Sequence, residues 1–174
     1  FDAHNPYVVP RDFPLRYSKV KRSEVIAADE RAFRALSASR TPDVTKAQRQ
    51  AAREEFVTTG LDAYDDCLRH LDDQVGRLID ALDARGLRRN TWVIITADHG
   101  EHFGEHDRYW HGSSLYRPVL DVPLLIVPPT DRLDQAGGPR SVSRPVSLRN
   151  LPATVADLVG QAGSSPFPGR SLRP

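Results

Sequence analysis

The sequence predicts an α/β fold, because an amphipathic helix pattern leads directly into one apolar strand pattern and a second follows it. Continuous apolar runs over 91–96 and 122–127 are typical of strands that are buried on both faces. The helix pattern precedes the first run, and Gly86 is expected to end it as a C-terminal cap. Its apolar residues recur at steps of three and four: Leu61, Tyr64, Leu68, Leu71, Val75, Leu78 and Leu82.

The opposite face of this helix is expected to lie in solvent, because its residues are charged. A helix that feeds a buried strand is half of an α/β unit. We therefore expect the apolar stripe to pack against the sheet and the charged stripe to remain hydrated. The charged stripe consists of Asp65, Asp66, Arg69, Asp73 and Arg77.

The first third of the chain is predicted to be a loop followed by helices. Residues 1–16 are rich in proline and aromatic side chains, and proline is excluded from helix interiors, so an extended loop is expected. The segments 23–40 and 41–58 are charged and helix-prone. The second should start at Thr41-Pro42-Asp43, which offers an N-cap and a first-turn proline.

The last third is predicted to be loops around one short helix. Residues 130–144 and 161–174 carry proline, glycine and charges and are expected to be loops. Between them, Asn150 is expected to cap a helix over 151–159 that Gly160 closes.

Composition indicates a globular protein and gives no electrostatic case for nucleic acid. The 174 residues are 39% hydrophobic and 27% charged, with 24 Lys plus Arg against 23 Asp plus Glu.

One domain over 1–174 is expected, and no apolar run approaches the roughly 18 residues of a membrane span. The chain has no methionine and opens on Phe1, so we expect its true N-terminus to lie further upstream. A single cysteine leaves the compartment open.

Four of the six histidines lie between positions 99 and 111, where the first predicted strand has just ended. Ligands bind at the C-terminal ends of strands in open α/β sheets. Asp98 and His99 offer a hard oxygen and an imidazole nitrogen, a pair able to hold a divalent metal beside a phosphate or sulfate ester. Gly100 and Gly104 would let the backbone turn tightly around such a site.

The alternative interpretation of the cluster is a polar surface loop with hydrated histidines. Four of its residues fit that interpretation individually, because a loop needs soluble side chains and two ligands already explain the placement. These four are Glu101, His102, Glu105 and His106.

Several motifs together resemble, in order, the sulfatase family of the alkaline phosphatase superfamily. The resemblance covers nearly the whole chain and implies a three-layer alkaline-phosphatase-like α/β sandwich, represented by the later part of the domain. The motifs are His4-Asn5-Pro6-Tyr7, Leu71 to Leu78, Asn90 to His106 around Asp98-His99-Gly100-Glu101, His111-Gly112-Ser113-Ser114-Leu115-Tyr116, Val122 to Ile126, Val146-Ser147-Leu148 and Gly169-Arg170-Ser171-Leu172.

The resemblance implies roles for four residues. Asp98 and His99 are expected to be metal ligands, with Ca²⁺ favoured and Mn²⁺, Mg²⁺ or Zn²⁺ as alternatives. His4 is expected to touch the ester oxygens or protonate the leaving group, and His111 to contact the same anion or a ligand. Both are therefore expected within on the order of 10 Å of the cleft that Asp98 faces. Arg117 departs from the family, which often has an acid there.

The family's nucleophile motif, Cys/Ser-x-Pro-x-Arg, does not occur in the sequence, so a formylglycine nucleophile is expected upstream. Cys67 lacks both the Pro and the Arg and is expected to be a helix residue near the core. The implied substrate is a small-molecule or glycan sulfate ester. A phosphodiester or phosphonate monoester hydrolase, a phosphoethanolamine-type transferase and a non-catalytic relative remain alternatives, and the oligomeric state stays open.

Overall fold

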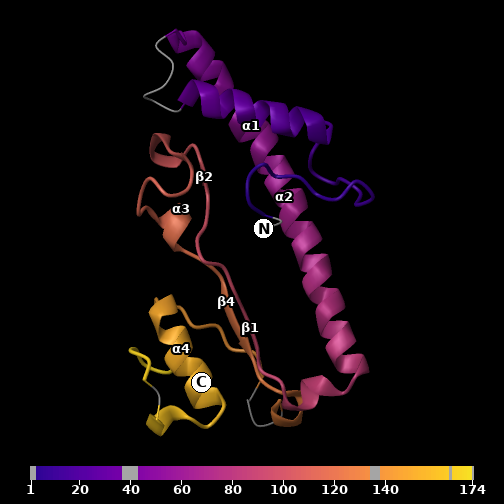
Figure 1. Ribbon diagram of the computed structural model, residues 1–174, viewed down its shortest axis with the longest axis vertical. Helices are drawn as coiled ribbons and strands as arrows, with labels where there is room; N and C mark the ends of the chain where they lie inside the picture. The colour runs from indigo at the N-terminus through magenta and orange to yellow at the C-terminus, as the bar shows by residue number, and fades with distance from the viewer. Residues whose placement is uncertain (1–2, 37–42, 134–137, 165, 174) are drawn as a thin grey trace. The chain divides into compact units, whose positions relative to one another are not determined.

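The computed structural model (Figure 1) describes residues 3–36, 43–133, 138–164 and 166–173. Contacts divide the chain into two compact units, each considered by itself below: Phe1–Ala81 with Thr96–Leu124, and Leu82–Ile95 with Leu125–Pro174. The helices and strands are α1 Arg22–Leu36, α2 Lys46–Ala84, β1 Val93–Thr96, β2 His102–Phe103, β3 Tyr109–Trp110, α3 Arg117–Leu120, β4 Leu124–Val127 and α4 Leu151–Leu158.

Helix α2 begins after Thr45, later than the sequence predicted. The Thr45 hydroxyl accepts a hydrogen bond from Gln48 N at 3.2 Å, and the Thr45 N–H donates to Gln48 Oε1 at 2.8 Å. This reciprocal pair is a capping box, which satisfies two backbone donors at the helix start. The predicted cap falls partly on residues 41 and 42, which lie outside the described residues, as do 37–40 at the end of the predicted first helix.

From Lys46 to Ala84, α2 is one continuous helix of 39 residues that joins the segments expected over 41–58 and 61–82. Gly86 follows it in a left-handed conformation, φ 67°, and donates its N–H to Asp83 O at 2.9 Å, as the predicted C-terminal cap requires.

The buried face of α2 is not the predicted one. Leu61, Leu68, Leu71 and Leu78 of the predicted stripe are exposed, and the buried residues lie on a neighbouring stripe. That stripe consists of Ala52, Phe56, Gly60, Ala63, Asp66, Cys67 and His70. Asp66 was expected in solvent but is only 1% exposed. Its carboxylate accepts the backbone N–H groups of residues 16–18 at 2.8 to 3.3 Å, and these bonds offset its desolvation.

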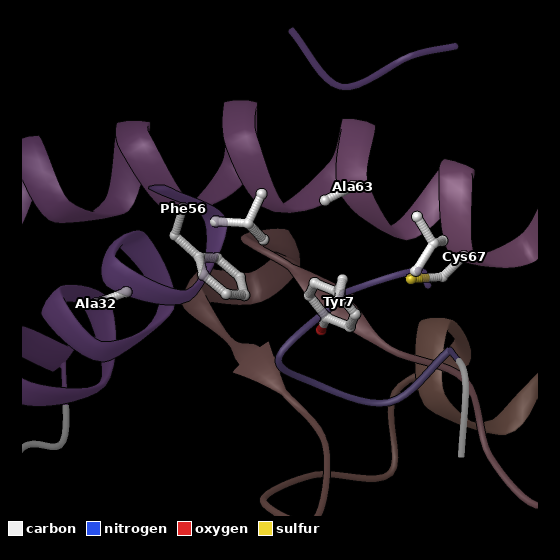
Figure 2. Packing of buried hydrophobic residues seen from close by; sticks show 7 residues of the cluster. Tyr7, Ala32, Phe56, Ala63 and Cys67 are labelled. Carbon is white, nitrogen blue, oxygen red and sulfur yellow. The ribbon is translucent and has the colours of Figure 1, made fainter. Parts of the chain in front are cut away.

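The core of the first unit forms between α1, α2 and the N-terminal segment (Figure 2). Residues 3–20 contain no helix or strand, as predicted, and this segment contributes Tyr7 and Val9 to the core. In Figure 2 the Tyr7 ring lies below α2 with its hydroxyl oxygen turned away from the helix. Cys67 is fully buried in the same cluster, which confirms its predicted place.

Strands β2 and β3 form a short antiparallel hairpin in which His102 pairs with Trp110 and Phe103 pairs with Tyr109. The Phe103 ring stacks on Phe56 of α2 with centroids 5.8 Å apart. At the start of the connection Gly104 has φ 112°, a conformation that strongly favours glycine, so the predicted turn at this position is confirmed.

In the second unit, β1 and β4 are hydrogen-bonded neighbours, and Figure 1 shows them side by side. The two strands lie in the predicted runs, but their residues are half-buried or exposed rather than buried on both faces. Full burial requires a layer on each face, and a two-stranded sheet within the described residues has too little around it.

Helix α4 lies where predicted, but Asn150 does not cap it. The Asn150 side chain instead accepts the N–H of Arg170 at 3.2 Å, and a 3₁₀ turn over Leu148–Asn150 precedes the helix. Gly160 follows the helix with φ 79°.

The helices and small sheets agree with an α/β class, and no helix within the described ranges is long and apolar enough to cross a membrane.

Candidate functional site

Asp98 and His99 follow strand β1 directly, as predicted. The Asp98 side chain is 93% exposed, and its Oδ1 accepts the backbone N–H of His99 at 3.1 Å. The Nε2 atom of His99 lies 3.9 Å from Asp98 Oδ1. A carboxylate and an imidazole therefore lie side by side just after the strand.

Three histidine rings from three segments of the chain meet beside Asp98. The rings of His99 and His111 stack with centroids 4.1 Å apart, and those of His4 and His111 lie edge to face at 4.9 Å. His4 and His111 therefore lie close together, and His111 also contacts His99. All four residues singled out from the sequence fall in one place.

Each of these three rings is held through Nδ1. His4 Nδ1 lies 2.8 Å from its neighbour's carbonyl, Asn5 O, and His99 Nδ1 lies 2.8 Å from Gly100 O. His111 Nδ1 lies 3.0 Å from a carboxylate oxygen of Glu101. Because all three partners are acceptors, the proton belongs on Nδ1 in each case. The lone pair of the neutral ring is then on Nε2, the nitrogen that can ligate a metal or take up a proton.

Gly100 serves a close approach between two backbones rather than the tight turn expected from the sequence. Its N–H donates to Val119 O at 2.8 Å. A Cβ atom at this position would lie 2.0 Å from the backbone oxygen of Pro118. Only glycine allows α3 to pack this closely behind the Asp98–His99 pair.

Trp110 turns the chain from β3 into His111 with a φ of 60°, which is uncommon for a bulky residue. Such a conformation costs about 1–3 kcal/mol and persists where surrounding contacts hold it. Here the indole Nε1–H donates to Asp29 of α1 at 2.9 Å, and the ring packs against Phe33 of the same helix. Helix α1 thus helps to place His111, which no sequence motif indicated.

Sequence reasoning missed the burial of Glu101 and His102. Both were expected as hydrated loop residues, but their side chains are 5% and 0% exposed. Glu101 accepts from His111, and His102 Nε2 lies 2.8 Å from the hydroxyl of Ser114. Residue type and spacing do not separate this pair from Glu105 and His106, which are exposed as expected. Only tertiary contacts make the distinction.

The Glu101 carboxylate lies among aromatic side chains of the core. Burial first, and then the charge of Glu101, raise the pKa of Tyr7 far above its usual range, and the same two causes raise the pKa of Tyr64. The Tyr7 hydroxyl is buried and, within the described residues, has no partner at ordinary hydrogen-bond geometry. Glu101 therefore places a negative charge at the boundary between site and core.

The donors at the end of β1 fit part of a divalent metal site. Asp98 presents a hydrated carboxylate, and His99 has Nδ1 engaged and Nε2 on the side of that carboxylate. Among the residues that the structure describes, no group of three or more His, Cys, Asp or Glu could hold a metal ion. The pair would therefore supply two ligands of a larger set.

Comparisons with known proteins agree with the motifs. A family model described as Sulfatase matches residues 2–161. The chain is 37% identical to "Uncharacterized sulfatase YidJ" of Escherichia coli over 63% of its own length, and 36% identical to "Arylsulfatase K" of Canis lupus familiaris over 59%. It is 33% identical to "Steryl-sulfatase" of Mus musculus over 64% of its length.

These matches cover 20%, 18% and 20% of the three relatives, so the chain spans about a fifth of their length. No solved structure matches the chain.

Proposed function

The chain belongs to the sulfatase family, and we propose that the full-length protein hydrolyses sulfate esters. The observation that carries this proposal is the convergence of His4, His99 and His111 beside the exposed Asp98. Relatives named as an arylsulfatase and a steryl-sulfatase support an organic sulfate ester as the substrate class. A small-molecule or glycan sulfate would both satisfy this chemistry.

Two of the histidines are proposed to act on the ester itself. Hydrolysis develops charge on the sulfuryl oxygens and on the leaving oxygen, and both need donors in a fixed position. With Nδ1 engaged, His4 and His111 gain and give a proton at Nε2. In the protonated form each ring donates from Nε2 to a sulfuryl oxygen or to the leaving group.

Asp98 and His99 are proposed to hold a divalent metal, Ca²⁺ in the first instance, together with ligands from outside this chain. Such an ion would stabilise negative charge on the sulfuryl oxygens. The nucleophile, a formylglycine, is also proposed to come from outside these 174 residues, because no cysteine or serine of the sequence lies in the family motif. The 174 residues alone are therefore expected to be inactive.

The test is turnover by the full-length protein, produced in a host that forms formylglycine. We expect 4-nitrophenyl sulfate to be cleaved with a higher kcat/KM than 4-nitrophenyl phosphate or bis(4-nitrophenyl) phosphate. Chelation should abolish the activity and Ca²⁺ should restore it. A higher kcat/KM for either phosphate would indicate that the substrate is a phosphate ester rather than a sulfate ester. No turnover of any of the three by protein with a formed nucleophile would contradict the proposal.

A further inference from the structure

Glu101 differs from the other acidic residue of the site in its degree of burial. Its side chain is 5% exposed, whereas that of Asp98 is 93% exposed. A buried carboxylate is costly unless a hydrogen bond or a positive charge compensates it. Among the described residues, the ring of His111 makes the close contact with this carboxylate, since His111 Nδ1 lies 3.0 Å and 3.3 Å from its two oxygens.

This contact differs from those that hold the other two rings. His4 and His99 each contact the carbonyl of the next residue, so the contact is local. Glu101 and His111 are ten residues apart; Glu101 directly precedes β2 and His111 directly follows β3, so the two face each other at the open end of the hairpin. Their contact therefore joins the segment after β1 to the segment after β3, and it sets where the His111 ring stands against His99.

We propose that Glu101 is a positioning residue for His111. Its carboxylate accepts the Nδ1–H of His111, which fixes the orientation of the ring and keeps Nε2 as the nitrogen that carries or releases the catalytic proton. This role rests on the proposed function, in which His111 contacts the ester.

Without Glu101 the His111 ring loses its anchor. It can then rotate about its Cβ–Cγ bond, which turns another ring atom toward the ester, or shift its proton to Nε2, which removes the lone pair from the nitrogen that faces the ester. Carboxylates that orient metal-ligating histidines typically contribute 10- to 100-fold to metal affinity or activity, and we expect an effect of similar size where the oriented histidine contacts the ester. The loss should fall mainly on kcat, because a misplaced proton donor weakens the transition state more than the bound ester.

The first test is a double-mutant cycle in the full-length protein. Glu101→Met keeps the size of the side chain without an acceptor, and Glu101→Gln keeps one acceptor oxygen. For 4-nitrophenyl sulfate we expect Glu101→Met to lower kcat by about 10- to 100-fold and Glu101→Gln to recover part of the loss. In a His111→Ala background Glu101→Met should cost less than about 2-fold, because the residue through which it acts is gone. An equal loss in both backgrounds would overturn the proposal.

The matched control is the same pair of substitutions at Glu105, which lies in the same segment, is exposed and makes no contact with the three histidines that the structure records. Both changes there should leave kcat within about 2-fold, as surface changes away from the chemistry do. Thermal unfolding of every variant identifies any that fails to fold, in which case Glu101→Gln carries the test.

A second measurement does not depend on activity. Nitrogen-15 NMR of histidine-labelled full-length protein reads the tautomer of each neutral ring, and His111→Ala assigns the signal. We expect His111 to carry its proton on Nδ1 in the wild type and to move toward the Nε2 form in Glu101→Met. An unchanged tautomer would overturn the positioning role. Absence of sulfate turnover in the wild type would instead contradict the proposed function, and the NMR result would still decide the role of Glu101.

Discussion

Asp66 and Glu101 are two carboxylates buried in the same unit, and they bind different kinds of partner. Asp66 accepts backbone N–H groups of residues 16–18, groups that take no part in chemistry. Glu101 accepts a hydrogen bond from the ring of His111, a side chain of a type that can itself give and take protons. Burial alone therefore does not mark a functional acid. The kind of partner is the basis of our proposal, in which the backbone donors tie Asp66 to the fold and the His111 ring ties Glu101 to the site.

Asp98 extends this comparison to an acid that is exposed. Its carboxylate does little to hold the fold together, since within the described part of the chain it contacts only His99. Substitution of an exposed acid that supports catalysis should lower kcat strongly and change the free energy of unfolding little. A buried structural acid should show the reverse.

The largest expected effect is that of Asp98→Asn on turnover by the full-length protein. If Asp98 is a metal ligand as proposed, loss of its charge should lower kcat by about 1,000-fold, which corresponds to about 4 kcal/mol in the transition state. The free energy of unfolding should change by less than about 0.5 kcal/mol, because the side chain is exposed. Steady-state kinetics and urea unfolding measure the two quantities. Asp107→Asn in the same segment is the control, and a similar loss of kcat there would break the assignment of Asp98.

Asp66→Ala should have the opposite profile. Three backbone donors lose their acceptor in a buried place, so the free energy of unfolding should fall by about 3 kcal/mol. Turnover per folded molecule should stay within about 2-fold. Asp72→Ala, on an exposed part of the same helix, should change stability by less than about 0.5 kcal/mol. If Asp66→Ala left stability intact but reduced kcat, the contrast with Glu101 would be wrong.

Gly100→Ala tests the link between the Asp98–His99 pair and Glu101. The added Cβ would meet the Pro118 oxygen at 2.0 Å, so the backbone must shift, and we expect a loss of about 2 kcal/mol in stability together with lower kcat. At Gly76 a Cβ meets nothing within 4 Å. Gly76→Ala in α2 should therefore stabilise the protein by about 0.5–1 kcal/mol. Equal effects at both positions would mean that α3 does not pack against Gly100.

Tyr7→Phe should have the smallest effect, and it sharpens the comparison at Glu101. The folded pKa of Tyr7 is raised, so above about pH 10 the unfolded chain releases a proton that the folded chain keeps, and stability falls as pH rises. Removing the hydroxyl should weaken that fall, while Tyr64 and Tyr109, whose pKa values are also raised, retain part of it.

Urea unfolding of wild type and Tyr7→Phe between about pH 8 and pH 11 measures this slope. At pH 8 the two proteins should differ by less than about 1 kcal/mol, because the hydroxyl makes no regular hydrogen bond to lose within the described residues. A clear destabilisation at pH 8 would indicate that the hydroxyl donates to Glu101. Glu101 would then have two side-chain donors rather than one.

The sequence was sufficient for what depends on short spacings. The positions of strands β1 and β4, the cap at Gly86, the turn at Gly104 and the core position of Cys67 all follow from local pattern and conformational preference. The proximity of His4 and His111 followed from a resemblance that spans many motifs. Local reasoning placed Asp98 and His99 directly after a strand.

Tertiary structure decided which polar groups are buried and which apolar groups are not. Periodicity identified the stripe with Leu68 but could not show that α1 and the N-terminal segment cover the neighbouring stripe with Phe56. Glu101 and Glu105 are the same residue type in one short segment, yet the site contact with His111 belongs to Glu101. The physical reason is that burial and orientation arise from partners distant in the chain, and a spacing carries no information about those partners until the backbone has brought them together.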